Sequence, residues 1–525
     1  MIMSRRLYTI FISLIVALGG FLLGFDSAVI SGAMPYYRVT FGLESGSMLL
    51  GFSVSSLILG AIFGNIVAGS LADFFGRSKI LRLTAILFAV SAIGSALAFD
   101  ITSFIIARII GGIGVGMAIL IAPMYIAEIA PRKMRGTLVT FNQLNIVVGI
   151  SIAYFSNLYF QQAIADPDLK WRVMLGVEAI PAILYLILLF FVPMSPRWLM
   201  QKNRNEEAKN VLLKIHGQEQ AAIEYDEIES NLNEETNKEK ARWAEVFSKR
   251  MKLVLIIGFG IAFFQQITGI NAIFYYAPMI FEMAGGGRDA AFMQAAILGV
   301  TNVVMTIVAM FLIDRIGRKP LLYIGATGIS LSLALVSFSF YKAQYVISPE
   351  TMQSLMVEIH ESAASAEQIA RIQKLEDLAG SEFDNELDFF DKVYDTVGPE
   401  TFQAYRDVIM RHSITINSIL VLIGLIMFVA SFAISMGPVM WALLSEIFPN
   451  KLRGLAISIV GFWNSIVSFS VATLFPVQLE LLGSTATYLI YSIFGLLSLI
   501  FVWRFVPETK GKSLEELEKE LTSKS

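Results

Sequence analysis

Apolar residues along this chain fall in long runs, and the charged residues fall between them. The first run starts at Leu7, and runs of similar length recur to the end of the chain. A helix needs about 20 apolar residues to cross a hydrocarbon core of ~30 Å. We therefore predict twelve membrane-spanning helices, at residues 7–33, 48–72, 80–99, 101–127, 136–160, 171–194, 251–284, 290–313, 319–340, 412–445, 453–479 and 484–506.

The first run has some features of a secretory signal peptide, because Arg5 and Arg6 precede it. It is too long for the apolar core of such a peptide, no small-residue cleavage site ends it, and further runs follow. We interpret it as an uncleaved first helix.

The basic connections all fall on one side of the predicted membrane. They are "GRSKILR" (76–82), "PRKMRG" (131–136), "DRIGRK" (314–319) and "NKLRG" (450–454). Connections on the other side, such as "QQAIADPDLK", are acidic or neutral. Because Lys and Arg concentrate in cytoplasmic loops, we predict that the basic side and both termini are cytoplasmic.

Composition supports the membrane class and excludes several others. The 525 residues are 55% hydrophobic and only 16% charged. A net charge of −3 gives no reason to expect nucleic-acid binding. The chain has no cysteine and three histidines, which excludes disulfides and thiolate sites and makes a metal or other cofactor unexpected.

Two polar segments interrupt the succession of spans. Residues 197–250, in a predicted cytoplasmic linker at 195–250, place Ala208, Val211, Leu212 and Ile215 at helical spacing. Residues 341–411 form an acidic extracytoplasmic insertion with helical patterning. Its carboxylates raise the possibility of calcium binding, but no D-x-D-x-D-G loop is present, and we favour a solvated helical cap.

The two halves of the chain repeat each other. "DFFGR" at 73–77 matches "DRIGR" at 314–318, and "EIAPRKMRG" at 128–136 matches "EIFPNKLRG" at 446–454. Each pair follows the equivalent span of its half. The repeat predicts an all-α fold of two six-helix bundles, suited to alternating access around a midplane site. We bound the bundles at 1–194 and 251–506, with a cytoplasmic tail at 507–525.

The repeated motifs carry charges of both signs. The positive-inside rule explains the basic residues but not why acidic residues recur at the same offsets. We interpret them as ion pairs that tie the cytoplasmic helix ends together in one state and break in the other. The predicted gate residues are Asp73, Arg77, Glu128, Arg135, Asp314, Arg318, Glu446 and Arg453.

One carboxylate lies inside the first span, at Asp26 in "GFLLGFDSAVISG". An ionised Asp in hydrocarbon costs about 2.5–3.5 kcal/mol, so it needs a partner. Arg108 in span four and Glu178 in span six lie at a similar depth, each ~10 Å inside its outer helix end. Burial favours the neutral carboxyl and a nearby guanidinium favours the charged one. We therefore predict that these three residues handle a proton, the alternative being a permanent structural ion pair.

Further polar and aromatic residues lie within the spans. Amides both donate and accept hydrogen bonds, as a hydroxyl ligand requires. Aromatic rings pack on the apolar face of a sugar ring, and no cationic cluster offers a phosphate site. A neutral polyhydroxylated solute fits best, the alternative being hydrogen bonds between helices. The candidate substrate-binding residues are Gln143, Gln265, Gln266, Asn271, Tyr275, Asn302, Trp441 and Trp463.

In these residues the chain resembles the sugar porter family of the major facilitator superfamily, and within it the bacterial xylose–proton symporter branch. The resemblance covers nearly the whole chain except residues 341–411. It rests on the motifs above together with "RIIGGIGVG", "SPRWL", "QQITGINAIFYYAP", "GPVMWALLSEIFPNKLRG" and "PETKG".

The resemblance implies a major facilitator fold and a monomeric proton–monosaccharide symporter in the lipid bilayer of a bacterial inner membrane. It also implies sugar contacts for the candidate amides and tryptophans, an outer gate at Tyr275, and the cytoplasmic gate. Facilitative members lack the carboxylate in span one, so Asp26 favours symport.

Three departures from the family pattern stand out: Met194 replaces a usual Glu, Phe462 stands where this branch has an amide, and residues 341–411 are added. A uniporter remains the first alternative. A transporter-like sugar sensor is less expected, because only a short tail follows the last span. No nucleophile–base constellation or nucleotide loop suggests an enzyme. "GGIGVG" lies within a span, where its glycines permit close helix packing.

Overall fold

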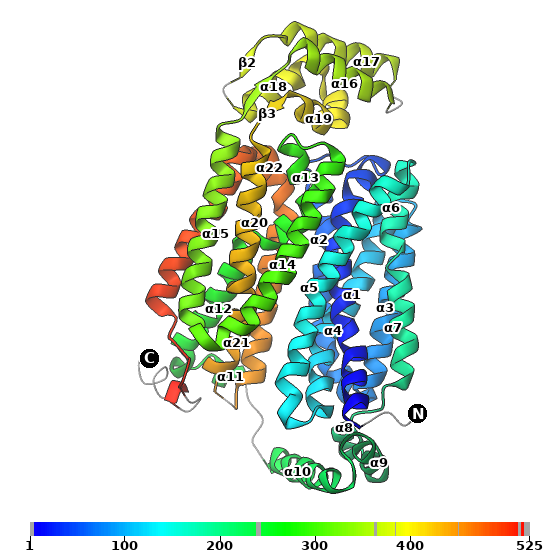
Figure 1. The fold of residues 1–525 in the computed structure, drawn as a ribbon, viewed down its shortest axis with the longest axis vertical. Helices are drawn as coiled ribbons and strands as arrows, with labels where there is room; N and C mark the ends of the chain where they lie inside the picture. The colour runs from blue at the N-terminus through cyan, green and yellow to red at the C-terminus, as the bar shows by residue number, and fades with distance from the viewer. Residues whose placement is uncertain are drawn as a thin grey trace. The chain divides into compact units, whose positions relative to one another are not determined.

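The computed structural model describes residues 5–237, 243–361, 365–383, 385–449, 451–512 and 516–518, and nearly all of the membrane part is helical (Figure 1). The first half contains α1 (Arg5–Thr40), α2 (Met48–Phe75), α3 (Arg77–Ala96), α4 (Ile101–Ile129), α5 (Arg132–Ala163), α6 (Pro167–Gly176), α7 (Ala179–Leu188) and the 3-10 turn η1 (Leu189–Phe191). The second half contains α12 (Lys252–Ile267), α13 (Ile270–Met283), α14 (Arg288–Ile316), α15 (Arg318–Tyr341), α20 (Ser418–Ile434), α21 (Met436–Ile447) and α22 (Arg453–Phe505).

Eleven stretches of helix in the described residues are long and apolar enough to cross a membrane. The last of them, α22, has 53 residues and a non-helical Gly483 with φ 72° at its centre. A left-handed φ is easily adopted only by glycine, so the chain turns there and α22 comprises two spans. Counted in this way, the described part of the chain contains the twelve predicted spans.

The chain divides into two compact units. The first comprises Met1–Ile30, Ser55–Ser156 and Trp171–Ser248, and the second comprises Ser31–Val54, Asn157–Lys170 and Lys249–Ser525. This division differs from the one based on the sequence repeat. The ends of α1, α2 and α5 that are remote from the repeated motifs belong to the second unit, although they lie in the first half of the sequence.

Glycines in the first unit allow α2 and α4 to pack with their backbones in contact. A Cβ added at Gly60 would clash with the carbonyl oxygen of Ile109, and one added at Gly112 would clash with that of Leu57. Gly116 stands in the same relation to Ala61. Small residues give this close approach in membrane helices, so "GGIGVG" serves helix packing, as its place inside a span predicted.

Three predicted spans are broken helices. The seventh is interrupted at Gly269, with φ 90°, between α12 and α13. The tenth is interrupted at Ser435, with φ −129° and ψ −93°, between α20 and α21. The sixth has a milder interruption beside Glu178, between α6 and α7, where the backbone keeps helical dihedral angles (φ −60°, ψ −26°). In transporters, breaks of this kind are found at substrate and ion sites.

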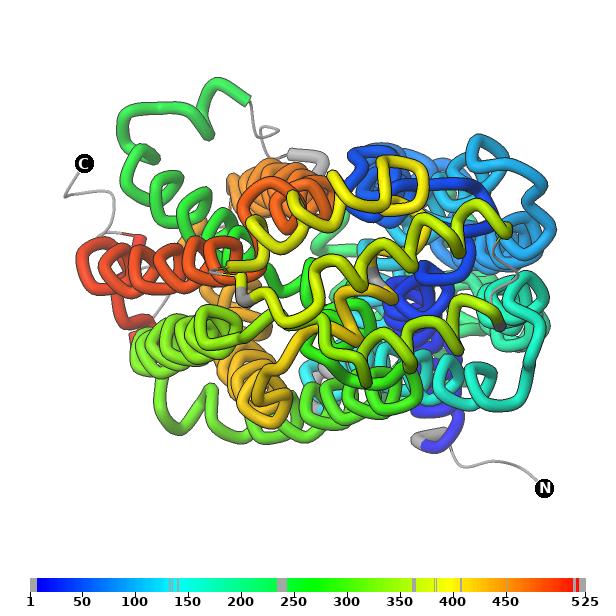
Figure 2. Tube along the Cα trace, turned by 90° about the horizontal axis from the view of Figure 1, so that it is seen from above, coloured from blue at the N-terminus to red at the C-terminus, as the bar shows by residue number. Residues whose placement is uncertain are grey.

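Residues 344–415 form a small domain, which we call the cap, at the end of the second unit opposite to the start of α15 (Figures 1 and 2). Its helices are α16 (Pro349–Glu361), α17 (Ala366–Gln373), the 3-10 turn η3 (Lys374–Leu378), α18 (Glu386–Val397) and α19 (Pro399–Ser413). A short sheet of order β2-β1-β3 joins its two ends, formed by β1 (Gln344–Val346), β2 (Glu382–Phe383) and β3 (Ile414–Thr415).

The cap meets the expectation of a helical insertion, but its sheet was not expected. Tyr345 pairs with Phe383 on one side and with Ile414 on the other. Strands of two or three residues are too short to give a period in the sequence. The predicted start of span ten at residue 412 also differs from the structure, because α19 continues to Ser413 and the span begins at Ser418.

The buried carboxylate of Glu386 links the cap to the membrane helix α22 by hydrogen bonds. Glu386 accepts hydrogen bonds from the Ser484 backbone N–H (2.7 Å) and hydroxyl (3.2 Å), so it caps the second span of α22. Burial raises the pKa of the Glu386 carboxyl, against the opposing effect of these bonds.

Within the cap, Arg411 and His412 contact Glu358 at 2.7 and 2.8 Å. Burial alone would raise the pKa of Glu358, but these partners outweigh it and the pKa is lowered.

The linker between the halves forms α8 (Pro196–Gln201), α9 (Asn205–His216), α10 (Gln218–Asn237), α11 (Trp243–Val246) and the 3-10 turn η2 (Lys249–Met251). Of the four residues at helical spacing, Ala208, Leu212 and Ile215 are buried and Val211 is partly buried. Ala208 packs in a cluster with Trp198 of α8. The amphipathic helix is thereby held against the first unit.

Candidate functional site

The first unit contains a buried ion pair deep inside its helices. Arg108 of α4 bonds through Nη1 to Asp26 Oδ1 of α1, and its Nη2 donates to the Asp26 carbonyl oxygen at 3.2 Å. Both side chains are at most 2% exposed. A bare charge at this depth would be costly, so each group stabilises the ionised form of the other.

A second carboxyl joins this pair. Glu178 is buried at the break between α6 and α7, and its side chain lies beside Asp26. A Cβ added at Gly111 would lie 3.2 Å from Asp26 Oδ2, so Gly111 leaves space for the carboxylate. When all three groups are ionised, the two carboxylates and one guanidinium carry a net charge of about −1, so one added proton makes the cluster neutral. The cluster is therefore suited to holding one exchangeable proton.

The second unit contains a network of amides next to the break at Gly269. Gln265 donates to the Met436 carbonyl at 2.9 Å, beside the break at Ser435. Gln266 donates to the side-chain oxygens of Gln265 and Asn464, each at 3.1 Å. Asn271 donates to Gln266 at 2.9 Å. The predicted amides of α12 and α13 therefore form one connected cluster.

Two residues of this cluster were not predicted: Ser468, whose Oγ accepts from Asn271 Nδ2 at 2.6 Å, and Asn464. Its Nδ2 donates to Gln265 Oε1 at 2.9 Å and to the Ala262 carbonyl at 3.0 Å. By the resemblance, the amide of this branch belongs at residue 462, two positions earlier, where this chain has Phe. Phe462 is 45% exposed, whereas Asn464 is 7% exposed. Asn464 could have been recognised as a polar residue within a span, next to the predicted sugar ligand Trp463.

The other candidate binding residues are distributed over both units. In the second unit, Trp463 stands edge-to-face on Phe259, and its buried indole N–H has no hydrogen-bond partner in the described part of the chain. Tyr275 and Asn302 are also buried there, and Trp441 is 44% exposed. Gln143 lies in α5 of the first unit and is exposed.

The predicted gate of the first half is a compact cluster. Arg77, at the start of α3, contacts Asp73 Oδ1 at 3.1 Å and Glu128 Oε1 at 3.1 Å. The Ser195 side chain lies beside Glu128, and Trp198 Nε1 donates to the Asp73 carbonyl at 3.0 Å. The sequence motif "SPRWL" thus belongs to this gate. Arg135, also predicted here, has a side chain that lies outside the described residues.

The gate of the second half repeats this arrangement. Arg318, at the start of α15, contacts Asp314 at 3.3 Å and Glu446 at 2.8 Å. Thr509, of the "PETKG" motif, donates to Glu446 as the counterpart of Ser195. Arg453 donates to the carbonyl oxygen of Phe448 at 3.3 Å, and no pairing of Arg453 with a gate carboxylate is found among the described residues.

Glu508 shows where the two gates differ. Its carboxylate accepts from the backbone N–H groups of Arg318 (3.2 Å) and Lys319 (3.1 Å), and so caps the start of α15. The equivalent place against Gly76 is taken by the Met194 side chain. Both helices have a glycine at the N-cap, Gly76 for α3 and Gly317 for α15, so a side-chain cap has to come from another segment. The replacement of Glu by Met at residue 194 therefore removes a helix cap from one gate and leaves the other intact.

We expect Met194→Glu to restore the missing cap, because the new carboxylate can accept from the N–H groups at the start of α3. An N-terminal cap contributes about 0.5–2 kcal/mol, and a negative charge there also interacts favourably with the helix dipole. The measurement is the thermal unfolding midpoint of the purified protein, which should rise. Met194→Gln is the uncharged control of equal length and should give a smaller rise, whereas an equal or lower midpoint for the Glu variant would contradict the assignment.

The fold and these clusters define a multi-pass membrane transporter built from two related halves. The sugar (and other) transporter family matches residues 12–359 and 403–521. The chain belongs to this family, whose members are transporters rather than enzymes.

Two curated relatives are similar over almost their full length. The chain is 34% identical over 515 residues to the arabinose-proton symporter of Bacillus subtilis, covering 98% of this chain and 95% of the relative. It is 34% identical over 544 residues to the D-xylose-proton symporter of Escherichia coli K12, covering 97% and 95%. An inward-open structure of the E. coli xylose transporter superposes with a TM-score of 0.73 at 33% identity, over 97% of this chain and 99% of that one.

Proposed function

We propose that the protein is a proton-coupled symporter that carries a monosaccharide into a bacterial cell by alternating access. The observation that carries the proposal is the buried Asp26–Arg108 pair, with Glu178 beside it, in a chain of the sugar transporter family. A facilitator needs no titratable group inside its helices. The names of the two relatives, both proton symporters, support the same conclusion.

In this proposal the sugar binds to the amide network of the second unit. Gln265, Gln266 and Asn271 offer donors and acceptors that a sugar hydroxyl can replace. The unpartnered indole N–H of Trp463 provides a further donor among the described residues. Gln143, in the first unit, is a further ligand, and Tyr275 belongs to the outer gate. A pentose is the first candidate, because the two relatives are named for xylose and arabinose.

The proton and the sugar are coupled through the helix ends. When Asp26 binds a proton it releases Arg108, which then pairs with Glu178. This exchange changes the packing of α1 against α4 and α6. At the other end of the helices, the Arg77 and Arg318 clusters hold the cytoplasmic side closed in one state and separate in the other.

We place the protein as a monomer in the lipid bilayer of the cytoplasmic membrane. The gate motifs, the linker helices and both termini lie in the cytoplasm, in accord with their Lys and Arg content. The cap then lies on the outer face.

The experiment that tests this function is sugar uptake by cells in weakly buffered medium. Addition of D-xylose or L-arabinose to cells that express the protein should make the medium more alkaline, and an uncoupler should abolish accumulation. Uptake without a pH response and without sensitivity to the uncoupler would instead establish a uniporter. A chain that moves no sugar but alters a sugar response would be a sensor.

A further inference from the structure

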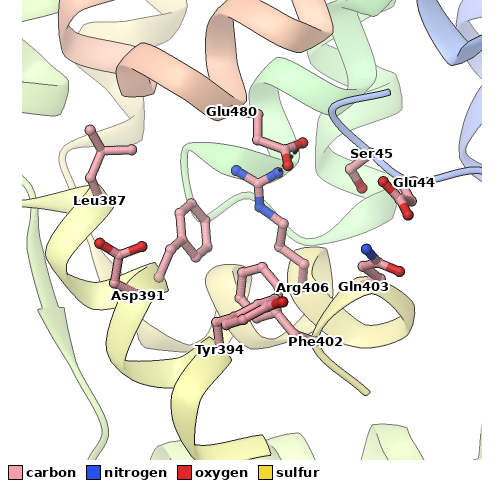
Figure 3. A pocket seen from close by; sticks show the side chains of 10 residues that line it. Glu44, Ser45, Leu387, Asp391, Tyr394, Phe402, Gln403, Arg406 and Glu480 are labelled. Atoms are coloured by element: carbon pink, nitrogen blue, oxygen red, sulfur yellow. Dashed lines mark hydrogen bonds and ion pairs between the residues drawn. The ribbon is translucent and has the colours of Figure 1, made fainter. Parts of the chain in front are cut away.

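A cavity of about 230 Å³ lies between the cap, the connection of α1 to α2 and Glu480 of α22, and none of the predicted sugar or proton residues lines it. Its volume is many times the roughly 10–15 Å³ that a single water needs. Helix α18 contributes Phe390, Asp391 and Tyr394 to its wall, and α19 contributes Gln403 and Arg406 (Figure 3). We propose that this cavity is a second binding site for a neutral monosaccharide, outside the membrane. The choice of ligand class rests on the proposed function.

Arg406 is the fixed centre of the cavity. Its side chain is 10% exposed, and its Nη1 contacts Glu480 of α22 at 3.3 Å. Its guanidinium lies 4.3 Å from the centre of the Phe390 ring. A guanidinium held between a carboxylate and an aromatic face keeps one orientation. Its remaining N–H groups are donors for a ligand that enters beside it.

The polar groups around Arg406 favour a ligand with hydroxyl groups. Asp391 and Glu44 supply acceptors on either side of it, and Gln403 supplies both a donor and an acceptor (Figure 3). Leu387 and Tyr394 add apolar surface for the C–H face of a ring. Three carboxylates against one guanidinium make the cavity unfavourable for an anion. No group of acidic or histidine side chains placed to hold a metal ion occurs in the described residues.

The cavity is a property of the insertion. Helix α18 lies wholly within residues 360–402, which the family does not match. This helix supplies Phe390, Asp391 and Tyr394, whereas Gln403, Arg406 and Glu480 lie in residues that the family matches. The site is therefore an addition to the transporter fold rather than a variant of its central site.

The connection between α1 and α2 closes the cavity. It supplies Glu44 and Ser45, and Gly46 packs so closely against Glu480 that a Cβ there would clash with its carboxylate. Gly51 packs in the same way on the backbone of Thr473 in α22. A bound sugar would hold these segments together, and so would favour the state in which the outer helix ends are packed.

The absence of cysteine from the natural chain provides a direct test. Gln403→Cys places one thiol in the cavity, and Asp395→Cys places one at an exposed position of α18 that does not line the cavity. The rate of alkylation by a maleimide is measured with D-xylose, L-arabinose or D-glucose present. At a sugar concentration ten times the dissociation constant, labelling at residue 403 should be about tenfold slower, and labelling at residue 395 should be unchanged. Leu387→Cys, on the opposite wall, should be protected in parallel.

The same measurement in a Gln265→Ala background separates this site from the central one. Protection that persists in this background supports the cavity, even if the chain transports no sugar. Three outcomes overturn the proposal. The first is that the sugar no longer slows alkylation of residue 403 in the Gln265→Ala background, because the effect was then transmitted from the central site. The second is that none of the three sugars slows alkylation, and the third is that tetramethylammonium slows it and the sugars do not, which would establish a cation site.

Discussion

Asp26→Asn should abolish accumulation of sugar and retain exchange of sugar across the membrane. One proton entering down 100 mV releases about 2.3 kcal/mol, which supports roughly fiftyfold accumulation at one proton per sugar. The amide of the variant side chain cannot carry this proton, so the ratio of internal to external sugar should fall to one. The measurement compares energised uptake with counterflow in proteoliposomes.

The variant should fold because the buried cluster has a second carboxylate. Glu178 lies beside Asp26 and can pair with Arg108 when Asp26 is neutralised. The companion variant is Glu178→Gln, which leaves the Asp26–Arg108 pair in place but removes the group to which Arg108 moves when Asp26 is protonated. Its accumulation of sugar should fall, but less than in Asp26→Asn, because the proton site itself is kept. Undiminished accumulation by the Asp26→Asn protein would show that the carboxyl of residue 26 is structural. Loss of exchange together with accumulation would show that the ion pair is needed for movement itself.

Gln265→Ala should have the second-largest effect, raising the KM for sugar. The Gln265 amide contacts Gln266, Asn464 and the Met436 carbonyl, so its loss removes a ligand group and loosens its neighbours. A buried polar group that loses its partner costs about 1–3 kcal/mol, or roughly fivefold to 150-fold in KM. The readout is the concentration dependence of initial uptake.

Asn464→Ala should also raise the KM for sugar, because Asn464 positions both Gln265 and Gln266. The effects of the two substitutions should be less than additive in the double variant, as for residues of one network. Phe462→Ala is the control, since this exposed side chain lies outside the network. An effect at Phe462 larger than at Asn464 would mean that the sugar is held by another face of α22.

Much of the membrane architecture is predictable because its causes are local. The length of an apolar run is enough to predict a membrane span. The repeated motifs around Arg77 and Arg318 are enough to predict that the chain consists of two related halves. A charged residue within a span also predicts that a residue of opposite charge lies nearby, because hydrocarbon cannot solvate an unpaired charge. The pairing of Asp26 with Arg108 could be predicted because the rise per residue along each helix places both side chains at the same depth in the membrane.

The residues that escaped prediction depend on which helix faces meet. Asn464 is no more polar than other amides in the spans, and only its contact with Gln265 and Gln266 distinguishes it. Glu508 lies in a recognisable motif, but its role as a helix cap follows from the fold of the tail back to the start of α15. The break at Ser435 was not predicted, although Gly437 and Pro438 follow it and Pro438 has no N–H to bond the Ile434 carbonyl.

The sequence by itself determined the number of spans, the duplication of the halves and the ionisable residues within them, because each depends on burial and spacing along one helix. The tertiary structure alone decided the amide network, the asymmetry between Met194 and Glu508, the sheet that closes the cap and the cavity beside Arg406. Each of these arises from contacts between segments far apart in the chain, and no periodicity along a single helix encodes such contacts.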